Sequence, residues 1–303
     1  MSEPAQARRL LHTNYNCVDI DGLERWYSEL FATAAVMRTV NEDSDGIAFG
    51  LRMSTSYRAT FLYDHRGPRR TSSLELVRWM HPPTIGRPYA HPWERGIQSC
   101  AYTAPDLDLI EATLAAVGGI VERRGSGWLL LRDPEGVRVE VYQSSNAPPE
   151  QVHLRVVTDD LESSAAWWGR LGLIHGQSPR VAGEQLWPSV RADGHERHIT
   201  GERALVAVDD PSLSIVLTTW SGPAPNGPTY GAPCHQGLYR FALAVDDVQE
   251  AYAALRADGI ARQEPHTFQL PGTKLTDGLT ILFLRDPDNI LVELVQRPRS
   301  HFR

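Results

Sequence analysis

Four stretches of the chain share one pattern of apolar and polar positions. Residues 12–19, 153–160 and 240–247 each alternate as a half-buried strand does, end in an aspartate and lead into an amphipathic run, and residues 99–106 form a weaker copy. The first and second of these three are 141 residues apart, as are the weaker copy and the last. The sequence therefore predicts a two-module unit that has been duplicated.

Each module is predicted to begin with a strand, continue with a helix and end in further strands. After the first alternating stretch, Leu23, Trp26 and Leu30 recur at the spacing of a buried helix face. Residues 133–136 and 286–289 both begin with Asp-Pro, which is typical of a tight turn between two strands. These turns close the second and fourth modules.

Composition narrows the class of protein. The 303 residues carry a net charge of −7 without long charged blocks, which argues against nucleic acid or an anionic membrane as a partner. The three cysteines are scattered and odd in number, which argues against a disulfide framework and favours a reducing, cytoplasmic location. No uninterrupted apolar stretch approaches the roughly 20 residues of a membrane span. We expect an enzyme-sized protein of two domains.

The repeated strand with its closing Asp, the helix after it and the late Asp-Pro turn before Val-Glu resemble the vicinal oxygen chelate superfamily. This superfamily includes glyoxalases, bleomycin resistance proteins, epimerases and type I extradiol dioxygenases. The resemblance covers nearly the whole chain as four βαβββ modules. It implies an α+β fold in which two modules form one curved mixed sheet around a pocket. It also implies metal ligands at the start of a module's first strand and at a Glu on its last strand.

The resemblance predicts two two-module domains, residues 8–145 and 150–298. The modules are expected at about 10–80, 96–144, 150–220 and 237–298, with irregular linkers near 80–95, 144–150 and 221–237.

Carried over one position at a time, the family's ligand positions give an uneven set. The residues at these positions are His12 and Glu75 in module 1, Ser99 and Glu140 in module 2, His153 and Val216 in module 3, and Arg240 and Glu293 in module 4. If modules 1 and 2 share a pocket, one imidazole and two carboxylates from His12, Glu75 and Glu140 would hold a divalent ion, with Fe, Mn, Zn and Ni all open.

The second half of the chain is the poorer candidate for a metal site. A guanidinium does not deprotonate and repels a cation, so Arg240 is expected to form a salt bridge with Glu293 or to hold a substrate carboxylate. His153, Arg240 and Glu293 are therefore expected to bind substrate. In some relatives module 1 pairs with module 4 instead. That arrangement would bring Arg240 into the site of His12 and Glu75.

The resemblance suggests a metal-dependent enzyme, similar to an extradiol dioxygenase, that acts on a small oxygenated aromatic molecule. Two alternatives stay open. One is an isomerase, epimerase or lyase of glyoxalase type, in which Glu75 or Glu140 shuttles a proton. The other is a metal-free binding protein of the resistance type. The expected partner is a small molecule, a homodimer is left open, and residues 266–273 are a candidate lid or substrate loop.

Overall fold

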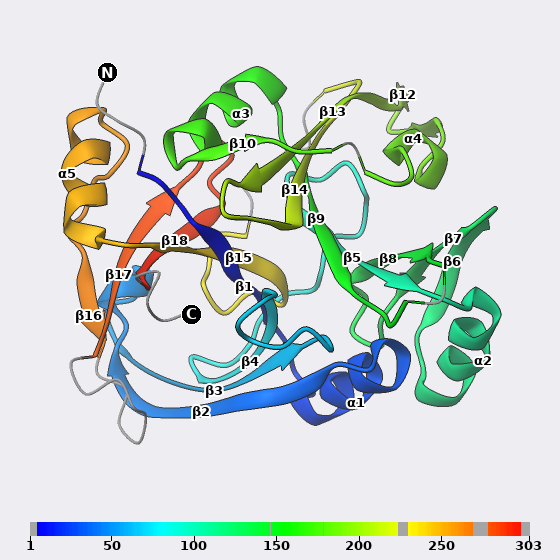
Figure 1. Cartoon of the computed structure of the whole chain (residues 1–303), viewed down its shortest axis with the longest axis horizontal. Helices are drawn as coiled ribbons and strands as arrows, with labels where there is room; N and C mark the ends of the chain where they lie inside the picture. The colour runs from blue at the N-terminus through cyan, green and yellow to red at the C-terminus, as the bar shows by residue number, and fades with distance from the viewer. Residues whose placement is uncertain (1–4, 146, 178, 224–229, 269–277, 298–303) are drawn as a thin grey trace.

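The computed structural model describes residues 5–145, 147–177, 179–223, 230–268 and 278–297. Two eight-stranded sheets form the body of the molecule, and the helices cover their edges and ends (Figure 1). We name the two sheets sheet A and sheet B. The α+β class expected from the sequence is confirmed. Within the described residues, no helix is long and apolar enough to cross a membrane.

Sheet A has the strand order β16-β17-β18-β15-β1-β4-β3-β2. Its strands are β1 (Arg9–Asn16), β2 (Ala34–Asp45), β3 (Ser54–Tyr63), β4 (Ser73–His81), β15 (Gly237–Val245), β16 (His266–Phe268), β17 (Leu279–Arg285) and β18 (Leu291–Gln296). Sheet A therefore joins module 1 to module 4.

Sheet B has the order β10-β13-β14-β9-β5-β8-β7-β6 and joins module 2 to module 3. Its strands are β5 (Gly96–Ala104), β6 (Ile120–Gly125), β7 (Trp128–Arg132), β8 (Arg138–Gln143), β9 (Gln151–Val157), β10 (Leu173–His175), β13 (Ile199–Ala207) and β14 (Asp210–Trp220). A small ribbon of β11 (Val190–Ala192) and β12 (His195–Arg197) stands apart. The helices are α1 (Ile20–Phe31), α2 (Leu107–Val117), α3 (Leu161–Arg170), α4 (Gly183–Leu186) and α5 (Val248–Ala257), with a 3-10 turn η1 (Ile47–Phe49).

The expectation that module 1 shares a sheet with module 2, and module 3 with module 4, is wrong. β1 pairs antiparallel with β15, and β5 pairs antiparallel with β9. Connection lengths give the reason: only residues 144–150 separate β8 from β9, so β9 takes the free edge of β5. The longer connections, residues 82–95 and 221–236, carry the chain between sheets. The boundaries 8–145 and 150–298 thus divide the repeats but not the sheets.

The aspartate that closes each repeated strand is a helix cap. Asp106, Asp160 and Asp247 each accept hydrogen bonds from two backbone N–H groups in the first turn of the following helix, and Asp19 accepts one. Such a side chain satisfies backbone donors that the helix itself leaves free. The repeat in the sequence is therefore a strand followed by a capped helix.

The register inferred for the first and third modules is confirmed. Asn14 of β1 lies opposite Glu75 of β4, and Arg155 of β9 lies opposite Val216 of β14. The second pair lies 141 residues after the first in the sequence, which is the offset of the repeat. Val216 therefore occupies in sheet B the place that Glu75 occupies in sheet A.

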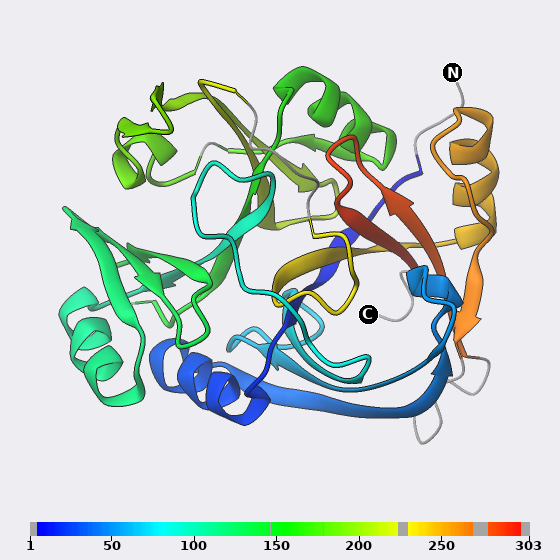
Figure 2. The same ribbon diagram turned by 180° about the vertical axis from the view of Figure 1, so that it is seen from behind.

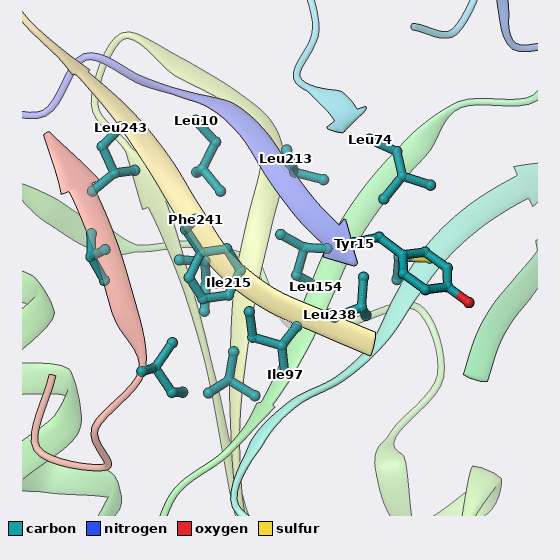
Figure 3. Packing of buried hydrophobic residues seen from close by; sticks show 14 of the residues in the cluster. Leu10, Tyr15, Leu74, Ile97, Leu154, Leu213, Ile215, Leu238, Phe241 and Leu243 are labelled. Atoms are coloured by element: carbon teal, nitrogen blue, oxygen red, sulfur yellow. The ribbon is translucent and has the colours of Figure 1, made fainter. Parts of the chain in front are cut away.

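The largest core lies between the two sheets. Leu10 and Phe241 from sheet A meet Leu154 and Ile215 from sheet B, and all four are buried (Figure 3). Because side chains alternate along a strand, the neighbouring positions point to the opposite, concave faces. Each concave face carries its own cluster of buried side chains, so the two concave faces look away from each other. We call the concave faces cup A and cup B.

The helices link the halves. Phe31 at the end of α1 stacks on Tyr102 of β5, with 4.2 Å between ring centroids, so a module 1 helix packs against sheet B. Trp168 of α3 meets Phe241 of β15 edge to face at 5.6 Å. α1 and α2 lie side by side, as the reverse view also shows (Figure 2). Neither sheet is independent of the other's helices.

The Asp-Pro turn of module 2 buries a carboxyl group. Asp133 accepts hydrogen bonds from the backbone N–H groups of Glu135 and Val137, both at 3.0 Å, and from the Tyr27 hydroxyl at 3.3 Å. Burial raises the pKa of Asp133 to about 7 despite these bonds. The protonated form is therefore favoured in the folded protein.

Asp133→Asn is expected to change how stability depends on pH. Because the folded pKa lies above the unfolded one, the contribution of Asp133 is complete at acidic pH and is lost as the pH rises through about 7. The variant should be more stable than the wild type above that pH, by a few kcal/mol at most. Urea unfolding across the pH range measures this. Asp160 is an exposed helix cap, and its backbone hydrogen bonds lower its pKa. Its contribution to stability should therefore be lost as the pH falls, so the stability difference between Asp160→Asn and the wild type should change with pH in the opposite direction. Parallel curves for wild type and Asp133→Asn would contradict the assignment.

Candidate functional site

Four ionisable side chains meet on the floor of cup A. They come from the four central strands of sheet A: Glu293 from β18, Arg240 from β15, His12 from β1 and Glu75 from β4. All four line the cavity on the concave side of sheet A. The chain neighbours of the two glutamates, Leu74, Leu76, Val292 and Leu294, fill the core between the sheets on the opposite face. Strand pairing and side-chain alternation therefore bring together residues from both ends of the chain.

Arg240 bridges the two carboxylates. Its Nη2 lies 3.2 Å from Glu75 Oε2, and its Nε lies 2.5 Å from Glu293 Oε1. The expected salt bridge between Arg240 and Glu293 is confirmed. Asn14 adds a long contact, with Nδ2 at 3.4 Å from Glu75 Oε2.

His12 faces the same carboxylates from the other side. Its Nε2 lies 3.4 Å from an Oε2 atom of both Glu75 and Glu293, yet it has no hydrogen-bond partner and is buried. Burial alone would raise the pKa of Glu293, but Arg240 and His12 hold it below the ordinary value of a carboxyl. Both carboxylates also raise the pKa of Arg240 against the effect of burial. The floor thus holds a buried ion pair between Arg240 and Glu293, with Glu75 and His12 in contact with it.

Aromatic side chains form the walls above this floor. The cavity has a volume of about 550 Å³, and the aromatic residues that line it are Phe49, Tyr57, Phe61, Tyr63, Phe268 and Phe283. Phe61 meets the His12 ring edge to face at 5.6 Å, and the Arg240 guanidinium lies 5.5 Å from the Phe49 ring. A cavity of this size, apolar around a few converging polar groups, is typical of small-molecule sites.

Cup B holds a second charged cluster, centred on Glu140 of β8. Glu140 accepts hydrogen bonds from Arg155 Nε at 2.8 Å and from Ser99 Oγ at 2.5 Å, and its Oε2 lies 2.9 Å from His153 Nε2. The Tyr142 hydroxyl donates to it as well. Burial alone would raise the pKa of Glu140, but Arg155 and His153 bring it well below the ordinary value. Both carboxylate oxygens are therefore fully engaged.

The segment between β10 and β13 closes cup B. Leu186 and Trp187, at the end of α4, join the buried cluster of the cup, and the Arg155 guanidinium lies 5.1 Å from the Trp187 ring. Glu202 anchors this segment, because it accepts from the backbone N–H of Gly183 and also contacts Arg155. Glu140 and Arg155 consequently have almost no contact with solvent.

The structure separates residues that were expected to act together. His12 and Glu75 lie in cup A, whereas Glu140 lies in cup B, so the set of His12, Glu75 and Glu140 does not form one site. His153 likewise lies in cup B, apart from Arg240 and Glu293. The grouping that matches the structure is the alternative in which module 1 pairs with module 4. Of the loop expected at 266–273, residues 266–268 form β16, with His266 and Phe268 lining cup A, and the remainder lies outside the described residues.

Several residues of the two sites were not foreseen. Arg155 is the main partner of Glu140, and Asn14 is its equivalent in cup A, 141 residues earlier. A signal for Arg155 was present, because it has the same parity as His153 on an alternating strand and must share its face. Trp187 carried no such signal, since it lies in an irregular segment between strands.

Neither cup is arranged to hold a divalent ion. In cup A the Arg240 guanidinium lies against both carboxylates, so their charge is already partly balanced, and a nearby dication would be repelled. In cup B, Arg155 has the same role for Glu140. Within the described ranges, no three His, Cys, Asp or Glu side chains form a metal-binding group. The donor sets as they stand do not fit a metal.

Residues 150–294 match the family model of the Glyoxalase/Bleomycin resistance protein/Dioxygenase superfamily. The match covers 145 of the 303 residues, so the second half of the chain is similar to this superfamily. The resemblance to vicinal oxygen chelate proteins is thereby confirmed. No curated protein sequence gives a significant match.

Solved structures of a glyoxalase I and of a protein assigned as a dioxygenase share the fold over nearly the whole chain. Glyoxalase I from Zea mays has a TM-score of 0.63 and 20% identity, covering 95% of this chain and 92% of that one. A Bacillus subtilis protein assigned as a dioxygenase has a TM-score of 0.59 and 12% identity, covering 100% and 88%. At these identities the likeness establishes the architecture, and the site must be judged from its own residues.

Arg155→Met is expected to cost about 3–5 kcal/mol of unfolding free energy, because it leaves Glu140 buried without its cation. Arg203→Met is the matched control on the same sheet: its partner Glu162 is largely exposed and screened by solvent, so the loss should be much smaller. Urea unfolding measures both. Adding Glu140→Gln to Arg155→Met should recover part of the loss, and equal losses for the two single variants would show that cup B does not depend on this pair.

Proposed function

We propose that the chain binds a small, oxygenated aromatic molecule in cup A and does so without a metal ion. One observation carries the proposal: Arg240 bridges Glu75 and Glu293 at the floor of an open, aromatic-walled cavity. The equivalent cup B is filled by Leu186 and Trp187. Cup A is therefore the better candidate for ligand binding.

The charge of cup A favours a neutral ligand over an anionic one. Glu75 and Glu293 outnumber Arg240 on the floor, so an anion would meet two carboxylates and only one guanidinium. A neutral ligand with a hydroxyl or carbonyl group avoids this repulsion, and its ring can lie among the aromatic walls.

A second candidate is acid–base chemistry of the isomerase or lyase type. It is favoured by His12, whose Nε2 lies unpartnered between the two carboxylates. A carboxylate held ionised, such as Glu293, can take a proton from carbon while Arg240 stabilises charge on an adjacent oxygen. Ligand incubated with the protein in D2O would then gain deuterium at carbon, which NMR detects and which simple binding does not produce.

The dioxygenase-like activity suggested by the resemblance has less support. The facial triad that activates oxygen in iron enzymes consists of two His and one carboxylate, whereas the floor of cup A offers one His, two Glu and an Arg. O2 consumption with hydroxylated aromatic substrates is the direct test of this activity. An isomerase or a binding protein would consume none.

Binding should be detectable by calorimetry with catechol and 2-naphthol as probes, and EDTA should leave the affinity unchanged. Phe61→Ala is expected to weaken binding by roughly tenfold or more, because burying a Phe side chain is worth about 1.5–3 kcal/mol. Tyr142→Phe, which alters cup B only, should bind as the wild type does. Loss of binding in EDTA would contradict the metal-free proposal, and equal effects of the two substitutions would contradict the choice of cup A.

A further inference from the structure

The floor of cup A differs from a metal site at one position. Three of the four positions that the resemblance assigns to metal ligands carry ligand side chains: His12, Glu75 and Glu293. The fourth carries Arg240, which contacts the same two carboxylates that would coordinate an ion. The guanidinium and an ion would therefore compete for one place.

Two of the distances among the three remaining donors are those found between ligands of one ion, although the three side chains form no metal-binding group as they stand. His12 Nε2 lies 3.4 Å from an oxygen of each glutamate. Donors that share one ion at about 2.1 Å lie roughly 3 to 3.4 Å from each other. The Nε2 atom is also buried and has no hydrogen-bond partner, which is costly unless something else satisfies it.

In cup B, an arginine also balances a buried carboxylate, but it comes from a different position of the repeat. There the cation is Arg155 on β9, which bonds both oxygens of Glu140, whereas the position equivalent to Arg240 is Ser99. The two arginines come from different places in the repeat, so one duplication does not explain both. In each cup, a fixed guanidinium balances the buried carboxylate charge.

We infer that Arg240 is a built-in cation that replaces the divalent ion of the superfamily, and that Arg240→His converts cup A into a site for a divalent ion. The substitution removes the competing charge and supplies a second imidazole to His12, Glu75 and Glu293. Two imidazoles and two carboxylates suit Zn²⁺, Ni²⁺ or Co²⁺. This inference rests on the proposed metal-free use of cup A.

The experiment compares metal binding by wild type and variant. Both proteins are stripped with EDTA, dialysed and titrated with Co²⁺, which is followed by its visible absorption, and with Zn²⁺, which is followed by elemental analysis. Wild type should bind neither ion stoichiometrically, and Arg240→His should bind one per chain. The melting temperature of the variant should rise with ion concentration, because the ion binds the folded state.

Three further variants locate the ion. Arg240→Lys keeps a cation in the cup and should bind no metal. Arg240→Gln removes the guanidinium and adds only a neutral amide oxygen as a donor, so it should gain an ion more weakly than Arg240→His does. It serves in place of Arg240→His if that variant does not fold. Adding Glu293→Gln to Arg240→His should weaken binding by at least about tenfold, since even the loss of outer partners costs that much.

Two results would overturn the inference. One is a stoichiometric ion in the wild type that His12→Ala removes, which would mean that Arg240 leaves the carboxylates to admit it. The other is a folded Arg240→His that binds no ion. Failure of the proposed function is a separate result: a wild type without affinity for catechol or 2-naphthol would end that proposal while the metal titrations still stood.

Discussion

The antiparallel pairing of β1 with β15 decides what this chain can do. Its main-chain hydrogen bonds join the first strand of the first module to the first strand of the last, across more than 200 residues of sequence. Only this pairing places His12 and Glu75 beside Arg240 and Glu293. With modules 1 and 2 in one sheet, His12 and Glu75 would instead share a cup with Ser99 and Glu140, which would have two carboxylates and no arginine from β15. The chemistry of cup A is therefore a consequence of topology as much as of residue type.

Buried carboxylates need a counter-charge, and this requirement explains both cups. A carboxylate removed from water is tolerated when it is paired and hydrogen-bonded. A bound metal ion can supply this counter-charge. A guanidinium can supply it as well, because it stays charged, offers several N–H donors and does not depend on the availability of a metal. Arg240 in cup A and Arg155 in cup B are two separate instances. Each is positioned by strand pairing, so the charge balance is part of the fold.

The sequence predicted the modules and the equivalence of Glu75 with Val216, because the first depends on local periodicity and the second on the repeat offset. The sequence did not predict which modules pair. Pairing module 1 with module 2 or with module 4 buries the same apolar strand faces, and the two arrangements differ only in the length and path of the linkers. The site was predicted only as an alternative for the same reason. Arg155 could have been found from its parity with His153. Trp187, in an irregular segment, could not.

The two cups also show how a duplicated scaffold separates its roles. Between the second and third strands of its module, cup A has a short turn whose Phe49 packs beside Arg240, while the corresponding segment of cup B carries α4 and places Trp187 beside Arg155. An arginine thus meets an aromatic ring in both. The turn leaves a cavity, whereas the helix fills it. Because the strands beneath are equivalent, one cup can supply stability through buried charge while the other stays open, and the length of one connecting segment separates the two outcomes.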